Sequence, residues 1–235
     1  MKRILVIGAT SGIGRALVVA ARAQGFDAVA AGRRRALLEE LGGECLELDA
    51  TAPDAVERVA AVGADTVIFN AGFGERTPEP DWERTERTLQ LNVLAFERLA
   101  QWALANCETF AATASVAGLR GLERTNGYSA SKAYMINAME GWRRQARHGG
   151  HPCRYVTLLP GFVDTAMGQA SSFWRCLPSE AACCILKGLK RGRRVIWVTP
   201  RWRFIGLLMR LMPRWLYERI PLGAPPPRAE KGTTT

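Results

Sequence analysis

A tyrosine and a lysine four positions apart, Tyr128 and Lys132, have the types and spacing needed for proton transfer. Residues i and i+4 of a helix lie on one face, so the lysine ammonium would lie beside the tyrosine phenol. A positive neighbour stabilises the phenolate and lowers the phenol pKa from its usual value of about 10. The hydroxyl of Ser115, earlier in the chain, could hold a carbonyl oxygen in place. These residues predict an acid–base site for the proton of a hydride transfer.

The hydride carrier of such a reaction would bind at a glycine-rich loop near the start of the chain. The loop follows an apolar segment and reads Gly8-Ala9-Thr10-Ser11-Gly12-Ile13-Gly14. Glycines in the pattern G-x-x-x-G-x-G permit a tight turn, a close approach of the backbone to a pyrophosphate, and close packing of the next helix. The free N–H groups at the start of that helix attract phosphate. The sequence therefore predicts a dinucleotide site, with a glycine-rich turn that binds nothing as the alternative.

Two arginines, Arg33 and Arg34, follow the second predicted strand, where an NAD site carries an acidic residue for the ribose 2′-hydroxyl. An arginine instead binds a 2′-phosphate in bidentate fashion, and an acid would repel that phosphate. A positive charge at the start of a helix is unfavourable unless an anion lies nearby. Arg33 therefore predicts NADP(H) as the cofactor in preference to NAD.

Short apolar segments alternate with longer amphipathic ones along most of the chain. We expect strands at residues 3–7, 27–31, 44–48, 65–69, 109–113, 154–159 and 195–198. We expect helices at residues 12–24, 35–41, 53–62, 81–104, 127–147 and 179–189. This alternation, with right-handed crossovers, predicts an α/β protein with a doubly wound parallel sheet, the Rossmann fold. The carboxyl ends of the strands would bring the glycine loop, Ser115 and Tyr128 to one edge.

In the order of its motifs the chain resembles the short-chain dehydrogenase/reductase family, from Gly8 to about Thr165 and more loosely to Val198. The match includes the glycine loop, N-A-G at 70–72, and Y-x-x-x-K at 128–132. The resemblance implies catalysis by Ser115, Tyr128, Lys132 and Asn92. It implies cofactor binding by Gly8, Thr10, Ser11, Gly12, Ile13, Gly14, Arg33, Asp49, Asn70, Ala71, Gly72, Tyr128, Lys132, Pro160, Gly161, Val163 and Thr165.

The resemblance also implies particular roles for five of these residues. Asn92 would support a proton relay with Lys132, and Lys132 would also hold the nicotinamide ribose. Asp49 would contact the adenine, Asn70 would steady the central sheet, and Thr165 would meet the carboxamide of the cofactor. The residue types alone also allow Asn70 and Asp49 to be turn residues and Thr165 to be a helix cap. One departure from the family pattern is Ile7, where a threonine is usual.

Two other classes of function compete with an enzyme. One is a non-catalytic dinucleotide sensor on the same fold, but the complete set of Ser115, Tyr128, Lys132 and Asn92 argues against it. The other is a nucleic-acid binder, because the net charge is +10. That charge is confined to the C-terminal region and no nucleic-acid motif is present, so we expect no nucleic-acid partner. The six cysteines form no C-x-x-C pair and the two histidines lie in a glycine-rich loop, so no metal site is predicted.

The positive charge is concentrated at residues 187–219, which contain ten basic side chains and one acid. We predict a domain at residues 1–200, an amphipathic helical extension at 201–222 and a disordered tail at 223–235. Arg203, Arg210 and Arg214 would share one face if the helix continued through Pro213. Such a helix is typical of contact with an anionic membrane, here through residues 201–220 and reinforced by 187–194. Burial over the pocket or against a partner subunit is the alternative.

The N-terminal residues predict no signal peptide, and no segment predicts a spanning helix, so we expect a cytoplasmic protein. With the predicted contact through residues 201–220, it would be peripheral on the inner face of a membrane. Residues 162–190 should form a lid over the substrate. Its Phe162, Met167, Phe173 and Trp174 predict an apolar alcohol or carbonyl compound, unless they only pack the lid. By resemblance, the predicted helices at 81–104 and 127–147 imply a homo-oligomer.

Overall fold

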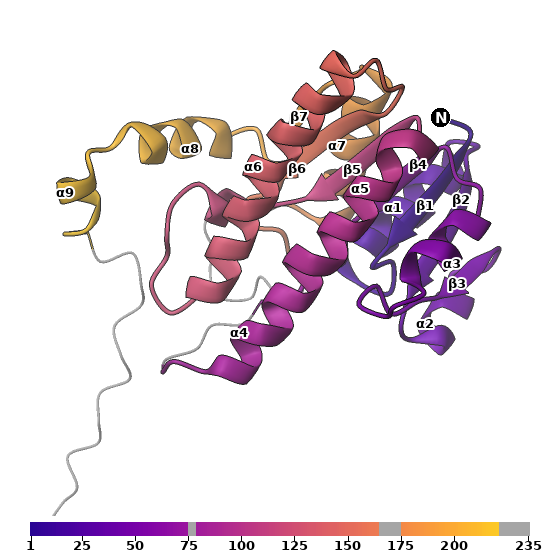
Figure 1. The fold of residues 1–235 in the computed structure, drawn as a ribbon, viewed down its shortest axis with the longest axis horizontal. Coiled ribbons are helices and arrows are strands. Elements are labelled where there is room, and N and C mark those ends of the chain that lie inside the picture. Colours follow the sequence, from indigo (N-terminus) through magenta and orange to yellow (C-terminus); the bar gives the residue numbers. More distant parts are fainter. Residues whose placement is uncertain (75–78, 165–174, 221–235) are drawn as a thin grey trace, which may run out of the picture.

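The computed structural model describes residues 1–74, 79–164 and 175–220. Within these residues, seven strands form one parallel sheet in the order β3-β2-β1-β4-β5-β6-β7 (Figure 1). The strands are β1 (Arg3–Ile7), β2 (Asp27–Gly32), β3 (Cys45–Glu47), β4 (Thr66–Phe69), β5 (Thr109–Thr113), β6 (Arg154–Leu159) and β7 (Val195–Trp197). The predicted doubly wound parallel sheet, the Rossmann fold, is confirmed, and each predicted strand has its counterpart.

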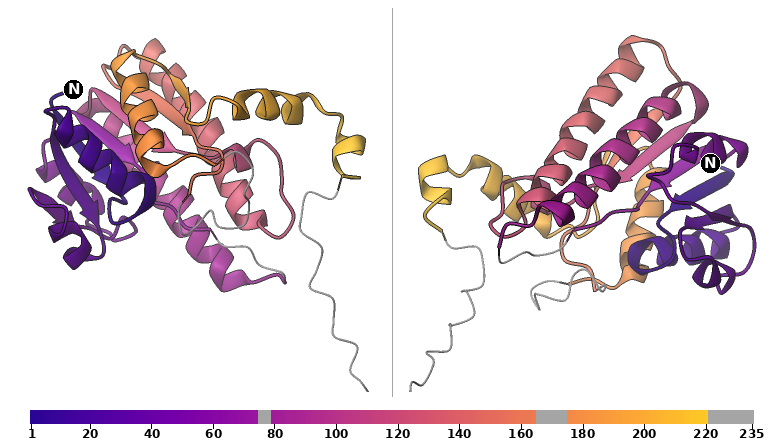
Figure 2. Two further views of the ribbon diagram at one scale, coloured as in Figure 1. Left: turned by 180° about the vertical axis from the view of Figure 1, so that it is seen from behind. Right: turned by 60° about the horizontal axis from the view of Figure 1, so that its bottom comes forward.

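Helices pack on both faces of the sheet, as the views in Figure 2 show. The described α-helices are α1 (Gly12–Ala23), α2 (Arg35–Glu39), α3 (Ala55–Ala61), α4 (Trp82–Leu89), α5 (Phe96–Asn106), α6 (Asn126–His148), α7 (Pro178–Lys190), α8 (Trp202–Leu211) and α9 (Arg214–Tyr217). One core contains buried residues of α1, α2 and α7, and the other contains residues of α3, α5 and α6. The central strands are therefore buried on both sides, which is typical of a parallel sheet.

Successive side chains of each strand point alternately into the two cores on either face of the sheet. In β1, Leu5 and Ile7 face the core beneath α3, α5 and α6. Ile4 and Val6 face the core beneath α1 and α7, because successive side chains of a strand point to opposite faces. All four side chains are at most 1% exposed, which accounts for the continuous apolar run in the sequence.

The strand order reverses between β1 and β4, and this reversal positions the site. The two strands are in register from Ile4 opposite Thr66 to Ile7 opposite Phe69. The residues that follow them, Gly8 and Asn70, therefore meet at the carboxyl edge. Ligands of open α/β sheets bind in the crevice at such a reversal point.

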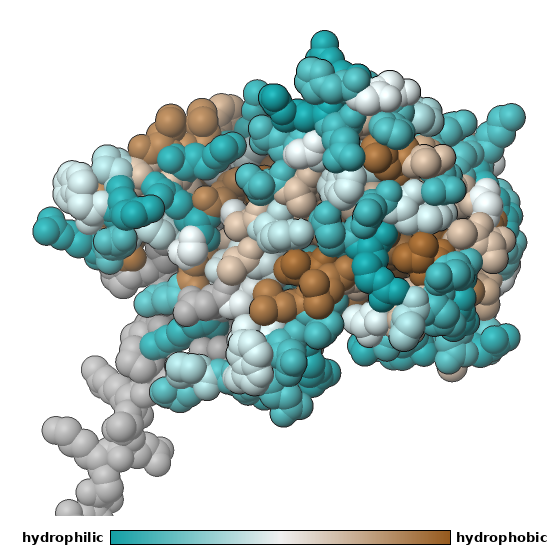
Figure 3. All heavy atoms as spheres, viewed as in Figure 1, coloured by the Kyte–Doolittle hydropathy of each residue, from teal (hydrophilic) through white to brown (hydrophobic). Residues whose placement is uncertain are grey.

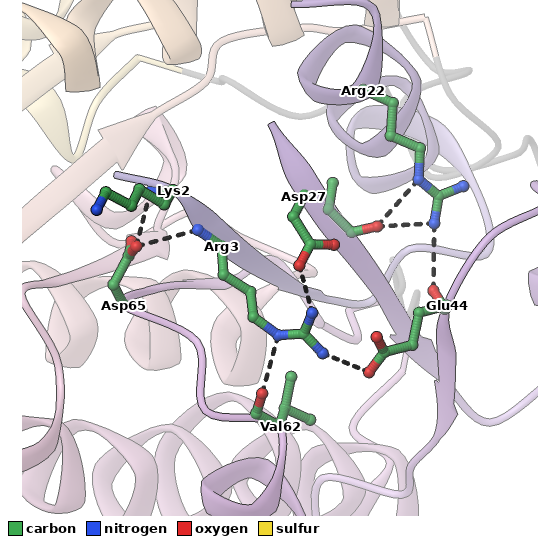
Figure 4. A network of polar contacts seen from close by, with 8 residues as sticks. Lys2, Arg3, Arg22, Asp27, Glu44, Val62 and Asp65 are labelled. Carbon is green, nitrogen blue, oxygen red and sulfur yellow. Dashed lines mark hydrogen bonds and ion pairs between the residues drawn. The ribbon is translucent and has the colours of Figure 1, made fainter. Parts of the chain in front are cut away.

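The opposite, amino edge of the sheet is held by a polar network around Arg3 (Figure 4). The guanidinium of Arg3 donates to the carboxylates of Asp27 and Glu44, and its Nε donates to the carbonyl of Val62 at 2.9 Å. The carboxylate of Asp65 accepts from the backbone N–H of Arg3 at 3.0 Å. These bonds join β1, β2 and the segments before β3 and β4, far from the carboxyl edge, so their role is structural.

Two predicted helices need correction. The predicted helix at 81–104 is α4 and α5 separated by a π-helix, η1 (Gln90–Ala95), and single-turn π segments occur often at functional sites. The C-terminal helix does not continue through Pro213, because Met212 ends α8 in an extended conformation with ψ of 128°. Arg214 therefore starts the separate helix α9 and does not extend the face of α8. In the described part of the chain, none of the helices is long and apolar enough to cross a membrane.

Candidate active site at the carboxyl edge of the sheet

The glycine loop between β1 and α1 forms a backbone cradle. Gly8 has φ of +90°, and a Cβ there would lie 2.6 Å from the backbone nitrogen of Ala71. A Cβ on Gly14 would lie 2.1 Å from the carbonyl oxygen of Gly8, so only glycine allows this approach of helix and loop. Ser11 precedes α1 in an extended conformation and makes no side-chain cap, and no acid lies in the first turn. The first N–H groups of α1 can therefore receive an anionic group such as a pyrophosphate.

Two arginines stand beside this cradle at the end of β2. The guanidinium of Arg34 donates to the hydroxyl of Thr10 at 2.6 Å, so the end of β2 is joined to the glycine loop. Arg33 is exposed and its charge acts on Asp49, which follows β3. Burial raises the pKa of Asp49, but hydrogen bonds from Thr51 and the charge of Arg33 bring it below its ordinary value. The arginines lie where the adenosine end of a dinucleotide would lie if its pyrophosphate bound the cradle.

The segment after β4, Asn70-Ala71-Gly72, connects the cradle to Lys132. The amide of Asn70 donates to the carbonyl of Gly8 at 3.3 Å and accepts from the hydroxyl of Thr113 at 3.0 Å. Asn70 therefore ties together the ends of β1, β4 and β5. A Cβ on Gly72 would lie 3.3 Å from Nζ of Lys132, so the backbone of this segment borders the lysine.

Lys132 is buried below the edge of the sheet. Its side chain is almost fully covered, and Nζ donates to the carbonyl oxygen of Thr113 at 2.7 Å. Burial penalises the charged ammonium and lowers the pKa of Lys132 to about 7. Nζ lies 5.7 Å from the centre of the Tyr128 ring, as expected for i and i+4 on α6.

The expected lowering of the Tyr128 pKa is wrong for this structure. Burial raises the pKa of the phenol, and a hydrogen bond with Ser115 acts in the opposite direction without overcoming it. The Lys132 ammonium donates to the carbonyl of Thr113 and does not offset the effect of burial on the phenol. A protonated phenol bonded to a serine hydroxyl is nevertheless suited to donate a proton to a carbonyl oxygen.

Asn92 lies in the π-helix η1 and is fully buried. Its side-chain oxygen accepts from the N–H of Phe73 at 2.9 Å, and its Nδ2 donates to the carbonyl of Phe73 at 2.7 Å. The same Nδ2 donates to the hydroxyl of Ser131 at 2.9 Å, and that hydroxyl donates to the carbonyl of Tyr128 at 2.7 Å. Asn92 thereby links the loop after β4 to the first turn of α6.

The loop after β6 completes the edge. The carbonyl of Pro160 accepts from the N–H of Val116, and the N–H of Gly161 donates to the hydroxyl of Thr199 at 2.9 Å. Val163 is buried and pairs with Cys176 in an isolated bridge. Of the predicted lid residues, Phe162 packs edge-on against Trp202 with 5.1 Å between ring centres. Thr165, Met167, Phe173 and Trp174 lie outside the described residues.

Several residues of this site escape sequence reasoning. A Cβ on Gly74 would lie 2.0 Å from Cδ2 of Tyr128, so the loop after β4 lies directly on the Tyr128 ring. Thr113 supplies the acceptor for Lys132, and Ser131 joins Asn92 to α6. A second glycine two positions after N-A-G was the one available signal for Gly74. Thr113 acts through its backbone carbonyl, which every residue has, so its residue type gives no signal of this role.

Comparisons with known proteins agree with the geometry. The family model for short chain dehydrogenases matches residues 2–175. An uncharacterized oxidoreductase of Myxococcus xanthus is 34% identical over 213 residues, which are 80% of this chain and 83% of that protein.

Solved structures share the fold at lower identity. A short-chain dehydrogenase of Burkholderia cenocepacia in complex with NADP has a TM-score of 0.83 at 23% identity, covering 95% of this chain and 100% of that one. A short-chain dehydrogenase/reductase of Burkholderia phymatum in complex with NAD has a TM-score of 0.77 at 19% identity, covering 88% and 92%. These structures support the Rossmann-like fold without deciding between the two cofactors.

Proposed function

Since the chain belongs to the short-chain dehydrogenase/reductase family of oxidoreductases, we propose that it interconverts an alcohol and a carbonyl compound with NADP(H). The single observation that carries this proposal is the grouping of Ser115, Tyr128 and Lys132 at the carboxyl edge, next to the glycine cradle. NADP(H), when bound, would supply or accept the hydride. The chain itself then has to bind the cofactor, orient the substrate oxygen and move one proton.

The proton would move at the phenolic oxygen of Tyr128. In the reducing direction Tyr128 gives its proton to the carbonyl oxygen, and in the oxidising direction it takes the proton of the alcohol. The hydroxyl of Ser115, hydrogen-bonded to Tyr128, would hold the substrate oxygen within reach of the phenol. Asn92 and Ser131 would keep the first turn of α6 in place through their bonds to Phe73 and Tyr128.

Charge at the end of β2 supports NADP(H) as the cofactor. Arg33 is exposed, and Arg34 already contacts Thr10 of the loop that would hold the pyrophosphate. Two guanidinium groups there favour a 2′-phosphate and leave no acid to accept a ribose hydroxyl from NAD at the end of this strand. The NADP complex of the Burkholderia cenocepacia neighbour agrees with this proposal, whereas the NAD complex of the Burkholderia phymatum neighbour shows that the fold accepts either cofactor.

The nature of the substrate is a proposal from the aromatic surroundings. Phe162 and Trp202 pack together at the carboxyl edge, which supports an apolar alcohol or carbonyl compound. A homo-oligomeric state, a cytoplasmic location and contact with a membrane stay predictions, as do the domain boundaries at residues 200 and 222.

The test is replacement of Tyr128 by phenylalanine. Tyr128→Phe should bind NADPH as the parent does, because the cradle and Arg33 are untouched, and should lose about 100- to 10,000-fold in turnover. NADPH consumption with a panel of lipid aldehydes, steroids and small ketones measures turnover, and fluorescence titration measures binding. A parent protein that binds NADPH and consumes it with none of these compounds would instead favour the non-catalytic sensor.

A further inference from the structure

The last two helices form an arm that protrudes from one end of the sheet (Figures 1 and 2). We define the C-terminal arm as residues 201–220, which contain α8 and α9. Its inner side is anchored, because Arg120 donates to the carbonyls of Met209 and Met212 and Tyr217 donates to the carbonyl of Gly121 at 2.7 Å. The arm is therefore held in a defined orientation by the loop between Ser115 and Tyr128.

The outer side of α8 is apolar and open to solvent. Phe204, Leu207, Leu208 and Leu211 are between 56% and 76% exposed, and their spacing of three, four and seven places them in one stripe. Trp202 and Gly206, which pack on the body, lie on the opposite side of the helix. Brown apolar side chains over the arm are visible at the upper left of Figure 3. An exposed apolar stripe of this kind marks a surface that binds a partner.

The partner must also match a strong positive charge. Arg203 and Arg210 are exposed and seven positions apart, so they flank the stripe on one side. Within the arm, three further arginines stand beside a single acid, Glu218. A second copy of the chain docked through the same face would bring like charges together, whereas an anionic surface would neutralise them.

We propose that the C-terminal arm binds the surface of an anionic lipid bilayer, with α8 parallel to the membrane plane. The apolar stripe would enter the boundary between headgroups and acyl chains, and the arginines would contact lipid phosphates. With only ten residues and internal arginines, α8 lies in the interface and does not span it. This proposal depends on the arm alone and not on the proposed activity.

The basic segment 187–194, expected from the sequence to reinforce the membrane contact, is left out of the proposal. It contains the last turn of α7 and the loop before β7, at the amino edge, whereas the arm follows the carboxyl end of β7. Lys190 there donates to Gln24 at 2.7 Å and lies over the ring of Phe26, both at the amino edge. A membrane that contacts the outer stripe of the arm therefore does not require contact with residues 187–194. Arginines of this segment provide a matched control.

Co-sedimentation of the full chain with vesicles of phosphatidylglycerol and phosphatidylcholine tests the proposal. The parent should bind vesicles that contain phosphatidylglycerol and lose binding as salt rises or when only phosphatidylcholine is present. A double variant Arg203→Gln, Arg210→Gln should bind about 30-fold more weakly, since each charge near the surface contributes about fivefold. The apolar double variant Leu207→Gln, Leu211→Gln should also lose binding.

The matched control is Arg191→Gln with Arg193→Gln, which removes the same charge at the opposite edge and should leave vesicle binding unchanged. Thermal unfolding checks that every variant folds, and sedimentation velocity reports its assembly. Three results would overturn the proposal: no binding by the parent, equal losses in the arm and control variants, or an oligomer that dissociates when Leu207 and Leu211 are replaced. The last result would assign the stripe to a second copy of the chain.

Discussion

Replacement of Gly74 by alanine would test whether the position of the Tyr128 ring determines the reaction rate. A Cβ at residue 74 would lie 2.0 Å from Cδ2 of Tyr128 and 2.5 Å from Cγ. Ordinary contact begins at 3.4 Å, so ring and loop must separate by about 1.4 Å. The backbone of α6 is not free to retreat, because a Cβ on Gly118 would already lie 2.5 Å from the carbonyl carbon of Lys132.

A displacement of about 1 Å at a catalytic group costs on the order of 100-fold in rate. We therefore expect Gly74→Ala to lower kcat by about 100-fold, while the Kd for NADPH changes little. We expect the effect on kcat to exceed the effect on Kd because an added Cβ at position 74 meets the Tyr128 ring, whereas NADPH would be held by the cradle between Gly8 and Gly14 and by Arg33. The rate of NADPH consumption with an active carbonyl compound measures kcat, and fluorescence titration measures Kd.

A matched control comes from the same helix as Tyr128. A Cβ on Gly141 meets no atom within 4 Å, so Gly141→Ala should leave kcat unchanged and stabilise α6 by about 0.5–1 kcal/mol. Thermal unfolding of both variants separates a displaced ring from an unfolded protein. Parental kcat in a Gly74→Ala variant with parental Tm would refute the view that this loop positions the phenol.

The remaining predictions concern the cofactor, pH and assembly. Arg33→Ala should weaken NADPH binding by about 10- to 100-fold and NADH binding little, since a charge-assisted contact contributes roughly 1.5–3 kcal/mol. Arg34→Ala, which removes the bond to Thr10, should weaken the binding of both NADPH and NADH. Equal losses of NADPH and NADH affinity in Arg33→Ala would contradict the assignment of the 2′-phosphate to Arg33. The pKa of Lys132 is about 7 in the folded chain and 10.5 ordinarily, so the unfolded state binds more protons above pH 7. Denaturant titrations should therefore show that the free energy of unfolding of the parent rises, relative to that of Lys132→Met, by up to about 2 kcal/mol between pH 7 and about pH 9. A difference between the two free energies that does not change with pH would exclude the lowered pKa of Lys132. Sedimentation should show a homo-oligomer, and a single 25.8 kDa species would refute that expectation.

The sequence alone predicts the fold because the signals for it are local. Apolar runs such as residues 3–7 need both faces covered, and the glycine pattern from Gly8 to Gly14 needs a strand before it and a helix after it. The spacing of Tyr128 and Lys132 on one helix is equally local, and the structure brings both to the edge where Ser115 follows β5. These features depend on neighbours within a few positions of the chain.

Tertiary structure decides what depends on residues far apart in sequence. The depth of Lys132 below the sheet, which lowers its pKa, follows from its position between the end of β5, where it bonds to Thr113, and Gly72 in the loop after β4. Gly74 meets Tyr128 across 54 positions of sequence, and no local pattern encodes that contact. The two basic segments near the C-terminus are close in sequence, but β7 places them at opposite edges of the sheet. Whether two charged segments share one surface depends on the direction of the strand between them. The pairing of that strand within the whole sheet sets its direction, so the spacing of charges along the sequence does not decide it.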